Sequence, residues 1–154
     1  MYILTVQLGF NKVTIKMSIA TRSRPAPQIK KEDSEERGEI LTPLCHIVTP
    51  TGMLGYGVNK EETTQVLERL VPTGVPTAII IDGGSTDSGP SKLALGTTTA
   101  PREAYVRDLT QLLHLVYKFR VPLIFSSAGG DGSNDHVCFM RDIIEEICSL
   151  KENK

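Results

Sequence analysis

The chain has 154 residues, of which 40% are hydrophobic and 23% charged, and its formal net charge is −1. This length is typical of a single domain. A charge so close to zero excludes the broad basic field that attracts nucleic acid or an anionic membrane, and the absence of tryptophan argues against a base-stacking surface. No apolar run approaches the roughly 18 to 20 residues that span a bilayer, so neither nucleic acid nor membrane is expected as a partner.

The three cysteines have no Cys-x-x-Cys spacing and no paired framework. An odd, scattered set is typical of free thiols in a reducing compartment, so the expected location is the cytoplasm. Cys138 and Cys148 fall in an apolar helical pattern and are expected to be buried and inert.

Residues 1–20 alternate hydrophobic with small or polar side chains, which predicts a β-hairpin with its turn at Gly9 to Lys12. Residues 21–40 lose all periodicity and carry many charges, which predicts a disordered linker. Residues 1–31 contain six basic and no acidic side chains, the bias of a mitochondrial transit peptide, and this location stays an alternative.

Residues 41–150 read as strand, loop and helix, three times over. The expected strands are Leu44–Thr49, Thr77–Asp82 and Val121–Ser126, and the expected helices are Lys60–Leu70, Pro101–Phe119 and His136–Leu150. This alternation predicts an α/β domain of βαβ units, a three-layer segment with a short, mainly parallel sheet. Three strands leave two outer edges to cover. Either the amino-terminal hairpin, or a partner such as a second copy, or a missing carboxyl-terminal region would cover them.

A glycine-rich loop follows each expected strand, and nine of the thirteen glycines lie in these three loops. Because ligands bind beyond the carboxyl ends of parallel strands, we expect the loops to converge on one cleft. Glycine allows backbone to approach a bound group closely. The expected ligand-binding residues are Gly52, Gly55, Gly57, Gly83, Gly84, Ser85, Thr86, Asp87, Ser127, Gly129 and Gly130.

Carboxylates at strand ends suit acid–base work or a divalent cation, because the sheet fixes them while leaving them open to a ligand. The expected catalytic residues are Asp82, Asp131 and His136. The candidate metal ligands are Asp82, Asp87, Asp131 and Asp135. The structural alternatives are that the aspartates cap loops and that Asn134 or Asp135 caps the last helix.

If the third loop carries chemistry, His136 is expected to face the cleft and to approach a carboxylate of the first or second loop. Of the other two histidines, His46 in a strand is expected to be structural, and His114 in a helix is expected to be structural or exposed.

The string Asp-Gly-Gly-Ser-Thr at residues 82–86 also resembles the first phosphate loop of the actin, sugar-kinase and heat-shock ATPase group. That loop joins two antiparallel strands near the chain start, whereas here a helix precedes the strand. Because of this difference in context, a phosphate-binding ATPase-like fold is the third hypothesis for the chain, after the two stated below.

Taken together, the three loops resemble the amino-terminal region of the acyclic terpene utilisation AtuA-like proteins, whose fungal relatives often carry CaiB/BaiF-type enzyme labels. The loop sequences Pro-Thr-Gly-Met-Leu-Gly-Tyr-Gly, Ile-Asp-Gly-Gly-Ser-Thr-Asp-Ser-Gly-Pro and Ser-Ser-Ala-Gly-Gly-Asp-Gly-Ser-Asn-Asp-His carry the resemblance, which covers about residues 45–148. The resemblance implies a catabolic or acyl-thioester context and a truncated member of a larger family, without assigned catalytic residues.

The leading hypothesis is an enzyme-like domain of unknown reaction that binds a small anionic metabolite, such as an acyl-thioester or a terpenoid-derived acid, between the three loops. A divalent cation is the one cofactor that the carboxylates suggest. The alternative is a truncated, catalytically silent domain that acts as an interaction module or as a fragment of a longer enzyme.

Overall fold

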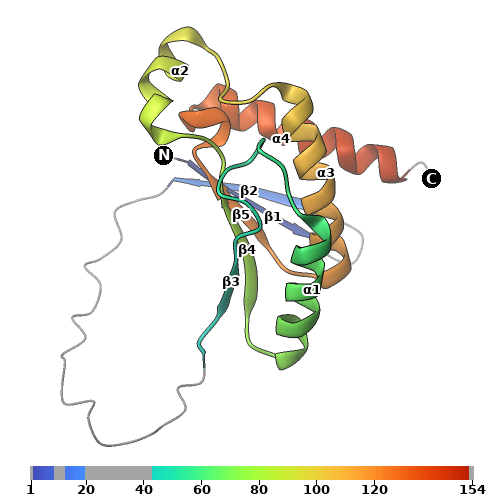
Figure 1. The fold of residues 1–154 in the computed structure, drawn as a ribbon. Helices are drawn as coiled ribbons and strands as arrows, with labels where there is room; N and C mark the ends of the chain where they lie inside the picture. Colours follow the sequence, from blue (N-terminus) through green and yellow to red (C-terminus); the bar gives the residue numbers. More distant parts are fainter. Residues whose placement is uncertain (1, 9–12, 20–42, 153–154) are drawn as a thin grey trace, which may run out of the picture.

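The computed structural model describes residues 2–8, 13–19 and 43–152. Its elements alternate between strands and helices along most of the chain, and Figure 1 labels them. The linker expected at residues 21–40 and the turn expected at Gly9 to Lys12 lie outside the described residues.

Five strands form one mixed sheet in the order β2-β1-β5-β4-β3. The strands are β1 (Tyr2–Leu8), β2 (Val13–Ile19), β3 (His46–Val48), β4 (Thr77–Asp82) and β5 (Leu123–Ser126). β3, β4 and β5 run parallel, as the sequence pattern predicts. β1 pairs antiparallel with both β2 and β5, so the amino-terminal hairpin covers one edge of the parallel strands.

The helices begin and end close to where the sequence signals place them. They are α1 (Lys60–Leu70), α2 (Gly89–Leu95), α3 (Arg102–Phe119) and α4 (Asn134–Glu152), with short 3₁₀ turns η1 (Val71–Thr73), η2 (Thr86–Ser88) and η3 (Ala128–Gly130). The Asn59 side chain accepts a hydrogen bond from the Glu62 amide at 3.1 Å and so caps the start of α1, and its side-chain amide donates to the Glu62 carboxylate.

α2 is the one α-helix of the described residues that the sequence pattern does not predict. Pro90 stands in its first turn and Gly96 caps its end in the left-handed conformation, so both terminal signals are present. The helix has only seven residues, too few to show an apolar period.

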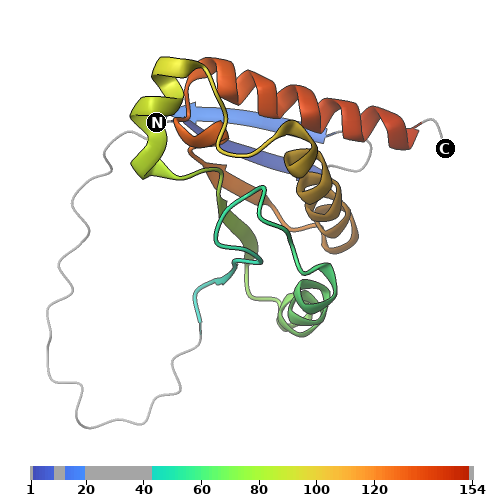
Figure 2. The ribbon, with the colours of Figure 1, turned by 45° about the horizontal axis from the view of Figure 1, so that its top comes forward.

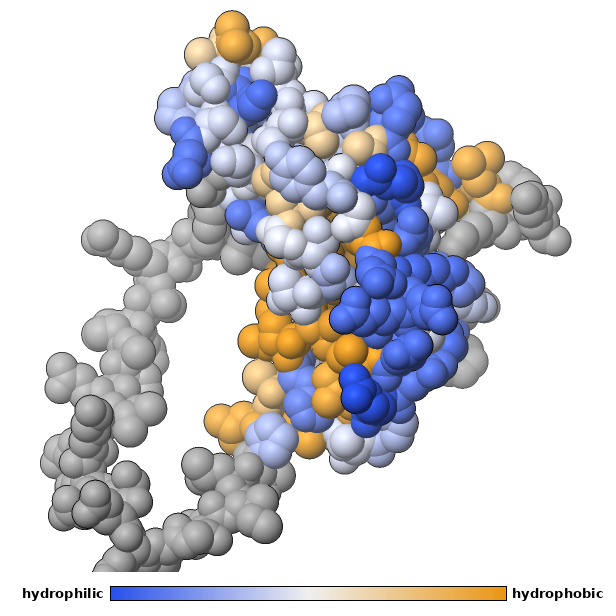
Figure 3. Space-filling model, in the orientation of Figure 1, coloured by the Kyte–Doolittle hydropathy of each residue, from blue (hydrophilic) through white to orange (hydrophobic). Residues whose placement is uncertain are grey.

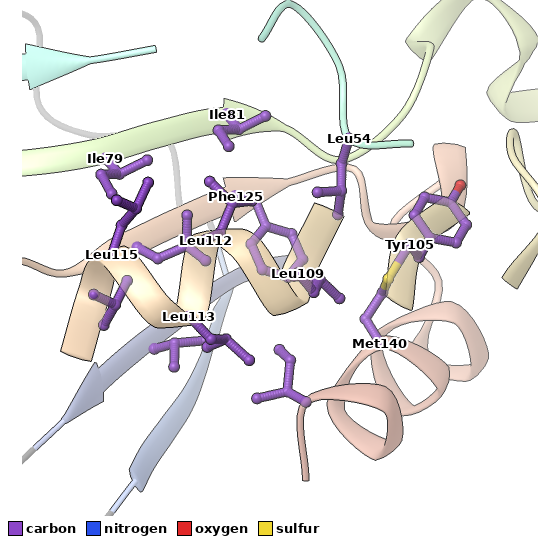
Figure 4. Packing of buried hydrophobic residues seen from close by; sticks show 14 of the residues in the cluster. Leu54, Ile79, Ile81, Tyr105, Leu109, Leu112, Leu113, Leu115, Phe125 and Met140 are labelled. Carbon is purple, nitrogen blue, oxygen red and sulfur yellow. The ribbon is translucent and has the colours of Figure 1, made fainter. Parts of the chain in front are cut away.

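The hydrophobic core lies between one face of the sheet and the row of helices. Figure 4 shows Ile79, Ile81 and Phe125 of the sheet pointing toward the leucines of α3, with Leu54 and Met140 closing the end near Tyr105. The apolar residues that recur at helical spacing in α3 and α4, among them Tyr105, Leu109, Val137 and Met140, are buried. The prediction that Cys138 is buried was wrong, because this residue lies on the exposed side of α4. Cys148 packs partly against the core.

The α/β class is confirmed, but the described elements form two layers instead of the expected three. α3 contacts α1 on one side and α4 on the other, so the three helices form a row on one face of the sheet (Figures 1 and 2). Strand order β3-β4-β5 follows chain order, which puts both crossover helices on the same face when the crossovers share one hand. Burial agrees: Ile79 and Ile81 are buried, while Ala78 and Ile80, which alternate with them along β4, are half-buried.

Candidate functional site

The three glycine-rich loops converge at the carboxyl end of the parallel strands. The Leu54 amide of the first loop donates to the carbonyl of Asp82, where the second loop begins, at 2.9 Å. The Gly83 amide of the second loop donates to the carbonyl of Ser126, where the third loop begins, at 2.8 Å. The topology alone led us to expect this convergence.

Glycine in the second and third loops serves contact between the loops themselves. A Cβ on Gly84 would lie 2.4 Å from the Gly130 Cα, and one on Gly83 would lie 2.2 Å from the Ser126 carbonyl oxygen. Such distances leave no room for any side chain, so the two backbones pack directly on each other. The space that we expected a ligand to fill is therefore closed between these two loops.

The first loop is held by Asp108, a residue that the sequence reading missed. Its fully buried carboxylate accepts hydrogen bonds from the amides of Gly55 and Gly57 at 2.8 and 3.0 Å. Both glycines have positive φ, which turns their amides toward α3. A signal was present, because Asp108 stands on the otherwise apolar stripe of Tyr105 and Leu109.

The third loop and the start of α4 carry a carboxylate–imidazole pair. Nδ1 of His136 lies 2.8 Å from Oδ1 of Asp131, and the side chains are 9% and 4% exposed. Gly129 lies against the ring, since a Cβ there would be 2.7 Å from the His136 Cγ. His136 therefore pairs with a carboxylate of its own loop, and the expectation of a partner from the first or second loop was wrong.

The local backbone explains why this pair forms. The Ser133 amide donates to Asp131 Oδ1 at 2.8 Å, which closes a turn just before α4. The Ser133 hydroxyl accepts from the His136 amide at 3.4 Å, and its carbonyl accepts from the Val137 amide, so Ser133 caps α4 where Asn134 or Asp135 was expected.

Asp131 is held as a carboxylate in a buried position. Burial raises the pKa of Asp131. Hydrogen bonds from the Ser133 amide and hydroxyl and from the His136 ring lower it by more, so the pKa of Asp131 lies below its ordinary value. The second oxygen, Oδ2, is buried and has no hydrogen-bond partner among the described residues. A carboxylate at this distance favours the tautomer that places a proton on Nδ1 of His136.

An open pocket of about 600 Å³ lies beside this pair. Nine residues line it: Gly96, Thr97, Thr98, Thr99, Ala100, Pro101, Arg102, His136 and Phe139. The volume suits a small ligand. Since Asp131 engages Nδ1, the nitrogen of His136 that remains for a ligand is Nε2, for which the structure gives no partner within the described ranges.

The segment 96–102 forms most of this pocket and was not among the predicted site residues. Thr99 joins it to the third loop, because its amide and hydroxyl both donate to the Gly129 carbonyl, at 2.8 and 3.2 Å. The Tyr105 hydroxyl accepts from the Ala100 amide at 3.0 Å, and burial raises the pKa of Tyr105, which keeps this phenol neutral. The run of three threonines before Pro101 was the available signal.

The carboxylates of the second loop, Asp82 and Asp87, form no hydrogen bond with Asp131 or His136 among the described residues. Asp82 Oδ1 accepts from the Gly84 amide at 3.2 Å, which is the capping role that we kept as an alternative. Asp87 is exposed on η2, which begins at Thr86, and the Ser85 carbonyl accepts from Ser88.

Asp135, Ser127 and Gly52 are not among the residues that line the pocket. Asp135 is exposed in the first turn of α4, whereas Ser127 is 3% exposed with a left-handed backbone (φ 50°). Nothing lies within 4 Å of a Cβ placed on Gly52, so this glycine sits in open space.

The described residues do not gather the metal ligands that the sequence suggested. In the ranges 2–8, 13–19 and 43–152, no three His, Cys, Asp or Glu side chains form a group that could hold a metal ion. Asp82, Asp87, Asp131 and Asp135 therefore do not make a common centre. The second loop also follows a parallel strand and leads into η2, which differs from the antiparallel hairpin of the ATPase phosphate loop.

Comparison with known proteins returned no matching family model, no matching curated protein and no matching solved structure. The resemblance to the AtuA-like proteins thus stays a prediction from the three loops. Among the described helices, none is both long and apolar enough to cross a bilayer.

Proposed function

We propose that the pocket beside His136 binds a small anionic metabolite and that His136, oriented by Asp131, transfers a proton to or from it. The observation that carries the proposal is the buried Asp131–His136 pair in the wall of a pocket of ligand size. A carboxylate behind an imidazole fixes its orientation and its tautomer, which is how general acid–base histidines are commonly held.

The pair supports both directions of proton transfer. With Nδ1 protonated against Asp131, a neutral ring presents the Nε2 lone pair as a base, and a charged ring presents an Nε2 proton as an acid. Thr99 and Phe139 add a hydroxyl and an apolar surface to the same pocket. A substrate with a polar reacting centre and an apolar body fits these groups.

Arg102 is the cation of the pocket and the group proposed to meet the anionic end. Its side chain is 45% exposed and forms an ion pair with Glu146 of α4. Glu146 lies ten residues after His136, about 15 Å along the helix. A bound anion near His136 would therefore compete with Glu146 for Arg102.

An acyl-thioester or a terpenoid-derived acid remains the proposed class of metabolite, on the strength of the loop resemblance alone. Proton transfer next to a carbonyl is the reaction class that an oriented histidine and an arginine support together. This proposal uses no metal ligand, and it assigns Asp82 to loop structure.

A second candidate is an interaction module, which the half-exposed sheet face favours. Leu44 and Ile47 at the β3 edge are 92% and 61% exposed. Exposed apolar side chains that adjoin one another often mark a protein interaction site. The two roles are compatible, because the pocket lies on the helix side at the carboxyl end of the sheet.

The experiment is a calorimetric screen of small carboxylates and acyl-thioesters against the full chain. His136→Gln should abolish binding of any ligand found, while His114→Gln, an exposed histidine of α3 outside the pocket, should leave it unchanged. Equal binding by the wild-type protein and His136→Gln would place the ligand elsewhere and overturn the proposal.

A further inference from the structure

The face of the sheet turned away from the helices is apolar at its centre. Ile80 of β4 and Ile124 of β5 are half-buried, and their strand neighbours on the opposite face are fully buried. Ile47 of the edge strand β3 is 61% exposed. We call Ile47, Ala78, Ile80 and Ile124, with Thr5 beside them, the open face.

No helix of the described ranges packs on the open face, and physical grounds call for a cover. Parallel strands almost always have both faces buried, because their side chains are apolar on both sides, as in β4 and β5 here. Figure 3 shows a hydrophobic surface over β3 and β4, next to the hydrophilic surface of α1. A contiguous surface of this kind typically marks a site of protein association.

Charges of opposite sign flank the apolar centre. The strand register puts Lys16, Thr5, Ile124 and Ile80 in one row across four strands, since Lys16 pairs with Thr5, Thr5 with Ile124, and Ile124 with Ile80. Asp82 lies on the same face, two residues beyond Ile80 on β4. The two charged residues are thus three strands apart, roughly 14 Å at the usual strand spacing.

This arrangement is complementary to itself. A two-fold axis that passes between Thr5 and Ile124 would bring the apolar centres of two copies together and place each Lys16 opposite Asp82 of the partner subunit. Contacts of this reciprocal kind are the basis of isologous dimers. A different partner whose surface carries charges of only one sign would place a like charge opposite either Lys16 or Asp82.

We propose that the open face binds a second copy of this chain through a two-fold contact, with Ile124 near its centre and Lys16 facing Asp82 of the partner subunit. The contact stacks the two sheets face to face, and each sheet keeps its own helices on the outside. It leaves the pocket at His136 free in both copies.

Sedimentation velocity over a range of protein concentrations tests the proposal on the full chain. The wild-type protein should form a dimer, and Ile124→Lys should weaken the dimer at least tenfold. Leu95→Lys is the control, because Leu95 is an apolar surface residue, 73% exposed, that lies on α2 and outside the open face. A wild-type protein that stays monomeric at its highest soluble concentration, or an Ile124→Lys dimer as strong as that of Leu95→Lys, overturns the proposal.

Charge reversal tests the register of the two copies. Lys16→Glu should weaken the dimer, and the double variant Lys16→Glu/Asp82→Lys should restore it, whereas Lys60→Glu on α1 should have no effect. Circular dichroism checks folding, since Asp82 also accepts the Gly84 amide. If the double variant folds and does not regain the dimer, the proposed pairing is wrong. If it does not fold, unequal effects of Lys16→Glu and Lys60→Glu support the contact and equal effects overturn it.

Discussion

Nδ1 of His136 lies 2.8 Å from Oδ1 of Asp131, and this contact joins the third loop to the first turn of α4. Both side chains are almost fully buried, yet His136 lines an open pocket. Asp131 therefore holds the turn before α4, while the ring of His136 faces the pocket that could hold a ligand.

Replacement of Asp131 by Asn should make stability depend less on pH. The pKa of Asp131 is lower in the folded chain than its ordinary value, so its contribution is present above about pH 4 and is lost as the pH falls through the folded pKa. We expect Asp131→Asn to lower the free energy of unfolding by about 1–3 kcal/mol at neutral pH. Urea unfolding at several pH values measures this, and a difference from wild type that persists undiminished at pH 2 would contradict it.

Gly84→Ala should destabilise the fold strongly, because the new Cβ would lie 2.4 Å from the Gly130 backbone. Overpacking against backbone costs about 1–3 kcal/mol or more. Gly52→Ala is the matched control, since nothing lies within 4 Å of its Cβ, and we expect a change within about 0.5 kcal/mol. Thermal unfolding of the two variants compares them, and similar melting temperatures would show that the loops do not pack as described.

Asp108→Ala should release the first loop. It removes the acceptor of the Gly55 and Gly57 amides from a fully buried position, for an expected loss of about 2–5 kcal/mol. Asp108 pairs with Arg107 at 2.8 Å, and Asp142→Ala likewise removes an aspartate that pairs with an arginine, but from an exposed site, and should cost less than about 0.5 kcal/mol. Hydrogen exchange should show faster exchange of the loop amides in Asp108→Ala alone, and slow exchange of these amides would be inconsistent with the clamp.

Glu146→Gln should strengthen the binding of anionic ligands. Freeing Arg102 from a half-exposed ion pair is worth at most about 1 kcal/mol, which corresponds to an affinity gain of up to about fivefold. Glu145→Gln, one residue earlier on α4 and 3.7 Å from Arg141, is the control and should change nothing. Calorimetry of both variants with one carboxylate measures the effect, and equal affinities would remove Arg102 from the proposed site.

Much of the fold could be predicted because local signals agree with the tertiary structure. The N-cap residue Asn59 marks the start of α1, and the 3.6-residue spacing of Tyr105, Leu109 and Leu112 marks the buried face of α3. The number of layers could not be predicted in this way. The apolar side chains of Ile80 and Ile124 predict burial on both faces of the sheet, but no described helix packs on the face that carries them.

The geometry of the proposed site could be read from the sequence only in part. The sequence pointed to Asp131 and His136, but it did not show that they pair with each other, since that depends on the turn closed by the Ser133 amide. Glycines 84 and 130 looked like ligand contacts, because close approach to a ligand and close approach to another backbone require the same residue. Segment 96–102 carries no charge pattern that would place it beside His136.

The most direct measurement of the central claim is a ¹⁵N-detected titration of the histidine side chains with a small carboxylate. We expect His136 to carry its proton on Nδ1 without ligand, and its Nε2 resonance to shift on saturation, while the rings of His46 and His114 stay unchanged. The shift should disappear in Asp131→Asn if the carboxylate orients the ring. A ring of His136 protonated on Nε2 alone, or one that no carboxylate or acyl-thioester perturbs, would contradict the proposed site.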